Sequence, residues 1–218
     1  MTVLHPARLH PIWPALPAHG AGQRIGLLGG SFNPPHAGHR LLSEIALRRL
    51  GLDWIWWLVT PGNPLKNRSD LEPLQARITH ARQLVRHPRI RVTAVEADVG
   101  ISRTRDTLRF LKRRCPTVRF VWLMGADNMA GFHRWHAWRD IAATVPIAVI
   151  DRPGFTLSGT VGPAAASLAR YRFEESDAAR LPDALPPAWV FLHGPRSPIS
   201  STILRMGNGG RIGNSQAE

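Results

Sequence analysis

Five apolar segments, four of them followed by a turn-like stretch, constrain the fold of this 218-residue chain more than any other feature. Near-continuous apolar runs of this length are typical of strands that are buried on both faces of a parallel sheet. We expect these strands at residues 24–29, 54–60, 90–96, 118–125 and 145–152, with a last one at 188–193. Helical periodicity separates them, at residues 38–50, 71–87, 104–114 and 129–143, and a short helix is expected near 164–170.

Four successive strand–helix units predict an α/β fold, a doubly wound, Rossmann-like parallel sheet in a single domain. Sheets of this kind bind ligands at the carboxyl ends of their strands. The unusual stretches of the chain all follow predicted strands, which favours a pocket at that edge. They are GSFNPPHAGH, TPGNPLK, MGADN and DRPG.

The predicted domain spans residues 23–206, between a flexible N-terminal arm (1–22) and a disordered tail (207–218). The arm holds four prolines in its first twenty residues and lacks the continuous apolar core of a secretory signal. No apolar run approaches the roughly 20 residues that a membrane span requires. Cys115 is the only cysteine, which excludes an internal disulfide and fits a cytoplasmic location.

The chain carries a formal net charge of +13, which favours polyanionic partners such as nucleic acids or phosphorylated small molecules. The basic residues are spread along the chain, so charge alone does not identify the partner. A nucleic-acid-binding module should show exposed aromatic residues among the basic ones. Because the peculiar residues lie at strand ends instead, we expect a ligand pocket and no nucleic-acid partner.

The stretch GGSFNPPHAGH, residues 29–39, matches neither GxGxxG nor GxxxxGK[ST], so it is not a common phosphate-binding glycine loop. It reads H-x-G-H at the start of a predicted helix, where free backbone N–H groups favour an anion. His36 and His39 are three residues apart and lie on roughly one side of that helix. Their imidazoles can donate hydrogen bonds to phosphoryl oxygens and stabilise charge in a transition state.

A second motif, ISSTILR at residues 199–205, places three hydroxyl residues at another predicted helix start. An N-cap explains one of these residues, Ser200 or Ser201, but not the whole set. Hydroxyls, free N–H groups and the Arg205 guanidinium together form a clamp for the outer phosphates of a nucleotide.

The two motifs together resemble the paired signatures of the HxGH nucleotidyltransferase superfamily, and most of all those of the bacterial nicotinate-nucleotide adenylyltransferases. Residues 102–116 resemble the family's Ser-Tyr-Thr…Thr-Leu segment. Residues 124–141 resemble its Gly-x-Asp and Phe-x-x-Trp segments, and VIDRPG resembles its Arg-Pro-Gly. The matches run in order from Arg24 to Arg205.

The resemblance implies that ATP and nicotinate mononucleotide react to give nicotinate adenine dinucleotide and pyrophosphate, a step of NAD biosynthesis. It implies Mg²⁺ carried mainly by the ATP phosphates, no protein metal site, no membrane partner, and a monomer or homodimer. The catalytic residues would be His36, His39 and Arg205. The ATP site would add Gly30, Ser31, Phe32, Gly125, Asp127, Ser201 and Thr202. The mononucleotide site would comprise Asn33, Asn63, Lys66, Thr104, Trp135 and Arg152.

Two positions depart from the family pattern, because Arg103 stands where a tyrosine is usual and His136 where a second aromatic sometimes occurs. By family position, Trp135 is expected to stack on the pyridine ring, and Trp138 to be its buried neighbour. The alternatives are a phosphopantetheine adenylyltransferase, a cytidylyltransferase, an enzyme specific for nicotinamide mononucleotide, or a basic nucleic-acid-binding module.

Overall fold

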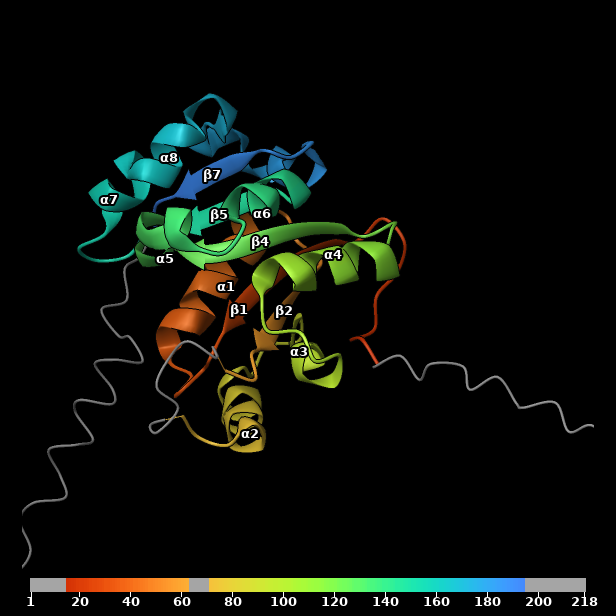
Figure 1. Ribbon diagram of the computed structural model, residues 1–218. Coiled ribbons are helices and arrows are strands. Elements are labelled where there is room, and N and C mark those ends of the chain that lie inside the picture. Colours follow the sequence, from red (N-terminus) through yellow and green to blue (C-terminus); the bar gives the residue numbers. More distant parts are fainter. Residues whose placement is uncertain (1–14, 63–70, 195–218) are drawn as a thin grey trace, which may run out of the picture.

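The computed structural model describes residues 15–62 and 71–194 (Figure 1). They contain one sheet of seven strands in the order β3-β2-β1-β4-β5-β7-β6, and every neighbouring pair is parallel. The strands are β1 (Arg24–Gly30), β2 (Trp54–Val59), β3 (Ile90–Thr93), β4 (Arg119–Gly125), β5 (Ile147–Ile150), β6 (Arg172–Phe173) and β7 (Trp189–Leu192).

Helices cover both faces of this sheet, as Figure 1 shows. One face is covered by α1 (Ala37–Arg49), α2 (Leu74–Leu84) and the 3-10 helix η3 (Glu175–Asp183). The other face is covered by α3 (Val95–Asp98), α4 (Thr104–Arg114), α5 (Ala126–Gly131), α6 (Trp138–Thr144) and α8 (Pro163–Ser167), with the 3-10 helix η1 (Phe132–Arg134). The doubly wound α/β prediction is confirmed.

The order of the strands reverses at β1, which lies between β2 and β4. The chain first runs outward through β2 and β3, and then returns to add β4 on the other side of β1. Because all of these strands are parallel, the loops after β1, β2, β4 and β5 emerge at one edge. This is the switch point at which such sheets bind ligands.

Two adjacent tryptophans show how the sheet divides the core. Successive side chains of a strand point to opposite faces, so Trp56 packs with the α4 layer and Trp57 with the α1 layer. Both side chains are fully buried. The near-continuous apolar character of β2 therefore reflects burial on both faces, as the sequence predicts.

The prediction of a strand over 90–96 is wrong in its second half, because β3 ends at Thr93. The Thr93 hydroxyl accepts the Val95 N–H, which turns the chain into the short helix α3. Glu96 is buried in α3, where the Thr107 hydroxyl donates to its carboxylate at 2.8 Å. Burial raises the pKa of the Glu96 carboxyl group.

The single helix predicted over 129–143 is also wrong, because α5, η1 and α6 divide this region. The chain is extended at Trp135, and Ala137 has a left-handed backbone with φ of 51°. Phe132 and Trp138 bury their rings in one cluster, with centroids 5.7 Å apart. A continuous helix would hold these two residues about 120° apart around its axis. The break therefore allows both to reach the same core.

Residues 155–188 form short elements that the sequence pattern hardly marks. They include α7 (Thr156–Val161), α8, where the short helix near 164–170 was expected, the 3-10 helix η2 (Ala169–Tyr171), and the two-residue strand β6. Elements of two to six residues contain too few turns or alternations to show periodicity.

The described part of the predicted N-terminal arm, residues 15–22, runs along the sheet domain. Leu16 packs against the core cluster on the α4 side, and the His19 ring lies 5.5 Å from the Trp56 ring. The arm and the tail stay predictions. In the part of the chain that the structure describes, no helix is long and apolar enough to cross a membrane.

We expect Gly26→Ala to destabilise the fold, because Gly26 lies in the central strand under tight packing. An added Cβ would lie 2.8 Å from a methyl carbon of both Leu52 and Leu123. Overpacking of this kind costs about 1–3 kcal/mol in free energy of unfolding. Urea unfolding measures the loss, with Gly20→Ala as the control because its Cβ would meet nothing closer than 3.8 Å. Equal stability of the two variants would contradict this packing.

Candidate active site

His36 and His39 lie together at the start of α1, at the carboxyl edge of the sheet. His36 is the N-cap residue and has an extended backbone, whereas His39 occupies the third helical position. Their ring centroids are 3.8 Å apart. The His36 N–H donates to Nδ1 of His39 at 3.2 Å, and the His39 N–H donates to the His36 carbonyl at 3.0 Å. These reciprocal bonds hold the two imidazoles in a defined relation.

The hydrogen bond at His39 also determines where this ring can carry a proton. Nδ1 accepts a backbone N–H, so in the neutral ring the proton resides on Nε2. His39 can therefore donate a hydrogen bond from Nε2. On His36, Nδ1 is buried and has no hydrogen-bond partner among the described residues. Burying a polar atom without a hydrogen bond costs free energy, so a ligand that bonds to this nitrogen would be favoured.

Burial and neighbouring charge favour the neutral form of both imidazoles. Burial, assisted by the Arg152 guanidinium, lowers the pKa of His36 to about 4. Burial also lowers the pKa of His39, with contributions from His36 and Arg152. At neutral pH the pair thus offers neutral N–H donors rather than two cations.

Two aromatic side chains, Phe32 and Trp57, pack beneath the histidine pair on the interior side. The Phe32 ring lies 4.7 Å from the His39 ring and stacks on Trp57 at 4.9 Å. Phe32 has a left-handed backbone with φ of 48°, which is strained for a non-glycine residue. The Trp57 indole donates to the Ser43 hydroxyl, which donates to the His39 carbonyl.

Asp127 and Arg152 face each other at the ends of β4 and β5. Arg152 Nη1 lies 3.3 Å from one carboxylate oxygen of Asp127, while the other oxygen is buried without a partner among the described residues. A Cβ at Gly125 would lie 2.4 Å from that second oxygen. Glycine at position 125 therefore lets the Asp127 carboxylate fold back over the strand end.

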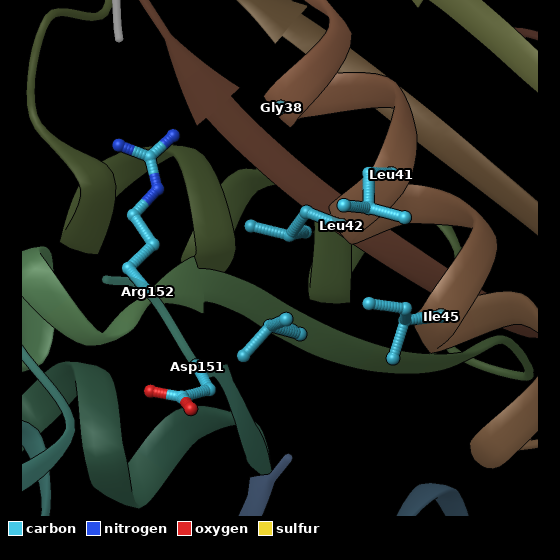
Figure 2. Close-up of a pocket in the computed structure, with 7 residues that line it drawn as sticks. Gly38, Leu41, Leu42, Ile45, Asp151 and Arg152 are labelled. Carbon is cyan, nitrogen blue, oxygen red and sulfur yellow. The ribbon is translucent and has the colours of Figure 1, made fainter. Parts of the chain in front are cut away.

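A shallow pocket lies between the start of α1 and the end of β5, and Figure 2 shows seven residues that line it. In this view the Asp151 carboxylate points away from α1, and the Arg152 guanidinium lies at the far end of an extended side chain. The Thr156 hydroxyl donates to Asp151 at 2.6 Å. The lining residues are Gly38, Leu41, Leu42, Ile45, Ile150, Asp151 and Arg152.

Thr104 and Trp135 lie on the face of the sheet that carries α4 and α6. Thr104 is the first residue of α4, and the half-buried Trp135 ring packs edge-on against Phe132 and Trp122. The two departures from the family pattern also meet here, because Arg103 Nη1 lies 3.2 Å from Nε2 of His136. Trp138 is buried, as expected. The ring-stacking role of Trp135 stays a prediction.

The structure brings together most of the predicted site residues that it describes. Gly30 ends β1, the following loop carries Ser31, Phe32 and Asn33 beside the histidines, and Asp127 and Arg152 follow neighbouring strand ends. The Asn33 side chain accepts the Glu72 N–H at 3.1 Å. Five predicted residues lie outside the described residues: Asn63, Lys66, Ser201, Thr202 and Arg205.

Sequence reasoning missed the residues that support the site from beneath, namely Ser43, Trp57 and Arg77. Arg77 is only 1% exposed and follows Leu74 by three residues on the buried stripe of α2. A charged residue on an apolar helical stripe is the signal that could have identified it. Residues 15–62 and 71–194 contain no group of three His, Cys, Asp or Glu side chains arranged to hold a metal ion.

The lowered pKa of His36 predicts a specific loss of stability in acid. Between about pH 6.5 and pH 4 the unfolded chain binds a proton at His36 that the folded protein excludes, so the free energy of unfolding falls as pH falls. His36→Asn removes this titration and keeps a good N-cap residue. Urea unfolding should show a shallower pH dependence for the variant, by at most about 1.4 kcal/mol per pH unit. Parallel pH profiles would contradict the lowered pKa.

Comparison with known proteins agrees with this geometry. Residues 27–207 match the model of the cytidylyltransferase-like family. A protein of Agrobacterium fabrum, named as a probable nicotinate-nucleotide adenylyltransferase, is 60% identical over 83% of this chain and 97% of its own length. A protein of Rhizobium meliloti with the same name is 55% identical over 85% of this chain and 99% of its own length.

A solved structure of the Plasmodium falciparum nicotinic acid mononucleotide adenylyltransferase, complexed with NaAD, shares the fold with a TM-score of 0.66. It is 16% identical, and the match covers 84% of this chain and 83% of that one. The histidine pair, the strand order and the close relatives lead to one assignment. This chain belongs to the nicotinate-nucleotide adenylyltransferase family of cytidylyltransferase-like nucleotidyltransferases.

Proposed function

We propose that this protein transfers the adenylyl group of ATP to nicotinate mononucleotide, giving nicotinate adenine dinucleotide and pyrophosphate in NAD biosynthesis. The observation that supports the proposal is the His36–His39 pair at the start of α1, in which His36 is buried and its Nδ1 has no hydrogen-bond partner among the described residues. Neutral N–H donors beside a cationic Arg152 match the oxygens of a polyphosphate. The names of the close relatives support this substrate pair.

The reaction needs positioning and charge stabilisation rather than a covalent intermediate. A phosphate oxygen of the mononucleotide attacks the α-phosphorus of ATP in line, and the bond from that phosphorus to the oxygen bridging the β-phosphate breaks. His36 and His39 hold the α- and β-phosphate oxygens as negative charge shifts toward the departing pyrophosphate. Ser201, Thr202 and Arg205 are proposed, from the sequence, to hold that pyrophosphate.

Asp127 and Arg152 would exchange partners when substrates bind. Their ion pair is long, at 3.3 Å, and single, so it costs little to separate. Asp127 would then accept hydrogen bonds from the adenosine part of ATP. Arg152 would turn to the mononucleotide phosphate, which carries more negative charge than the Asp127 carboxylate. Gly30, Ser31, Phe32 and Gly125 would border the ATP.

Mg²⁺ would accompany the ATP phosphates and neutralise part of their charge. Of the described carboxylates near the pocket, Asp151 accepts the Thr156 hydroxyl, and Asp127 pairs through one of its two oxygens with Arg152. This donor set fits an ion held mainly by phosphates and water, as Mg²⁺ commonly is. The chain's own contribution is the pair of neutral imidazoles, which can stay close to the ATP–Mg²⁺ complex without repelling the ion.

The mononucleotide would extend toward the start of α4 at Thr104 and toward Trp135, which follows η1. Asn33, Asn63 and Lys66 would provide further contacts. Arg103 adds a cation at this end of the site and would favour the nicotinate carboxylate over the uncharged amide. The cytoplasmic location and the monomeric or dimeric state also remain proposals.

A substrate comparison tests the proposed reaction. We expect purified protein with Mg-ATP to release pyrophosphate fastest with nicotinate mononucleotide and more slowly with nicotinamide mononucleotide. Chromatography of the dinucleotide product accompanies the pyrophosphate assay. Turnover of phosphopantetheine alone would refute the substrate and retain the superfamily, whereas no turnover together with salt-sensitive RNA binding would favour the nucleic-acid module.

Two substitutions at His39 separate its structural nitrogen from its proposed functional one. Asparagine can replace Nδ1 as the acceptor of the His36 N–H but has no donor at the Nε2 position. We expect His39→Asn to fold and to lose about 10²- to 10³-fold in kcat, as is typical when one transition-state donor is removed. Glutamine places an amide N–H₂ near the Nε2 position and should retain more activity. Two variants with wild-type kcat would exclude a catalytic role for His39.

A further inference from the structure

Arg77 is a buried cation that hydrogen-bonds to backbone carbonyl groups of three separate segments. Its Nε donates to the Glu72 carbonyl at 2.9 Å. Its Nη1 donates to the Ser31 carbonyl at 2.7 Å and to the Thr60 carbonyl at 2.8 Å. Burial lowers the pKa of the guanidinium, but arginine keeps its proton in proteins. The planar fork can reach all three carbonyls at once.

These three carbonyls belong to different parts of the candidate site. Ser31 lies in the loop between β1 and α1, Thr60 follows β2, and Glu72 precedes α2. The backbone of Glu72 adds a second link to the first loop, because its N–H donates to the Asn33 side chain. Arg77 and Asn33 thus connect the histidine-bearing loop to the neighbouring end of the sheet.

The bond to Ser31 also determines the orientation of the peptide unit between Ser31 and Phe32. In a trans peptide the carbonyl and the following N–H point in opposite directions. Holding the Ser31 carbonyl toward Arg77 therefore directs the Phe32 N–H away from it. The left-handed backbone of Phe32 follows at once, and the Phe32 ring contacts the His39 ring. Strained conformations of this kind persist only where neighbouring contacts enforce them.

We propose that Arg77 is a positioning residue of this site, which holds the Ser31–Phe32 backbone so that the Phe32 ring fixes the His39 imidazole. Arg77 acts through Phe32 and contacts no substrate. Its consequence for turnover rests on the proposed adenylyl transfer, whereas its consequence for the His39 ring does not. A misplacement of about 1 Å in a catalytic group can cost about 100-fold in rate.

The test compares Arg77→Met and Arg77→Lys with a matched control, Arg89→Met. Arg89 also donates to a backbone carbonyl, that of Leu52 at 3.2 Å, but Leu52 precedes β2 at the opposite edge of the sheet. We expect Arg77→Met to lower kcat by about 10- to 100-fold, with a smaller change in KM for ATP. Arg77→Lys keeps the charge without the fork and should recover part of kcat. Arg89→Met should match the wild type.

Histidine NMR supplies a readout that needs neither substrate nor turnover. The Phe32 ring lies close enough to the His39 imidazole to shift its proton signals through the ring current. Spectra of the His36→Asn and His39→Asn variants identify the two imidazoles. We expect the His39 signals and the His39 pKa to move in Arg77→Met and to stay in place in Arg89→Met.

The possible outcomes decide the proposal in either direction. A folded Arg77→Met with wild-type kcat and unmoved His39 signals would overturn it. Shifted His39 signals without any turnover in the wild type would support the positioning role while refuting the proposed reaction. If Arg77→Met does not fold, Arg77→Lys decides by the same spectra, since unmoved His39 signals in that variant would also overturn the proposal.

Discussion

The position of β1 at the centre of a parallel sheet is the constraint on which the rest of the structure depends. Hydrogen bonding to β2 on one side and β4 on the other brings the ends of strands distant in sequence to one edge. The chain adds β2 and β3 on one side of β1 and then β4 and β5 on the other side. The loops after β1, β4 and β5 therefore lie close together where the strand order reverses. Close packing requires glycine at Gly26, because a Cβ there would overlap the Leu52 and Leu123 side chains.

At that edge, the chemistry arises from placing polar groups where water is scarce. Burial and the nearby Arg152 charge lower the pKa values of both histidines, so the pair is neutral in the ligand-free protein. A bound polyphosphate would bring negative charge close to the two rings and would strengthen the hydrogen bonds that their N–H groups donate. The backbone bond into Nδ1 of His39 already orients that ring for the task. The protein thus holds its donors in place before substrate arrives, which is the main requirement for in-line phosphoryl chemistry.

Much of the fold could be predicted from local patterns, and the errors have identifiable causes. Helix α4 begins and ends where the sequence predicts, at Thr104 and Arg114, because its periodicity is clear. The prediction of a single helix over 129–143 is wrong, because burying Phe132 and Trp138 in one cluster outweighs helical periodicity. The prediction of a strand over 90–96 is wrong in its second half, because the Thr93 hydroxyl accepts the Val95 N–H and starts a turn. Both errors arise from contacts whose effect on the backbone is not visible in a hydrophobic pattern.

The sequence by itself determined the chemistry that the site can perform: two histidines three residues apart at a helix start, and the glycines and arginine that follow other strands. Only the tertiary structure decided how these groups are oriented and charged. Arg77 contacts Ser31 and Thr60, which are 46 and 17 residues away in the chain. Asp127 and Arg152 are brought together by the pairing of β4 with β5. The physical reason is that pKa values and hydrogen-bond geometry depend on burial and on distances between segments, which form only when the chain is packed.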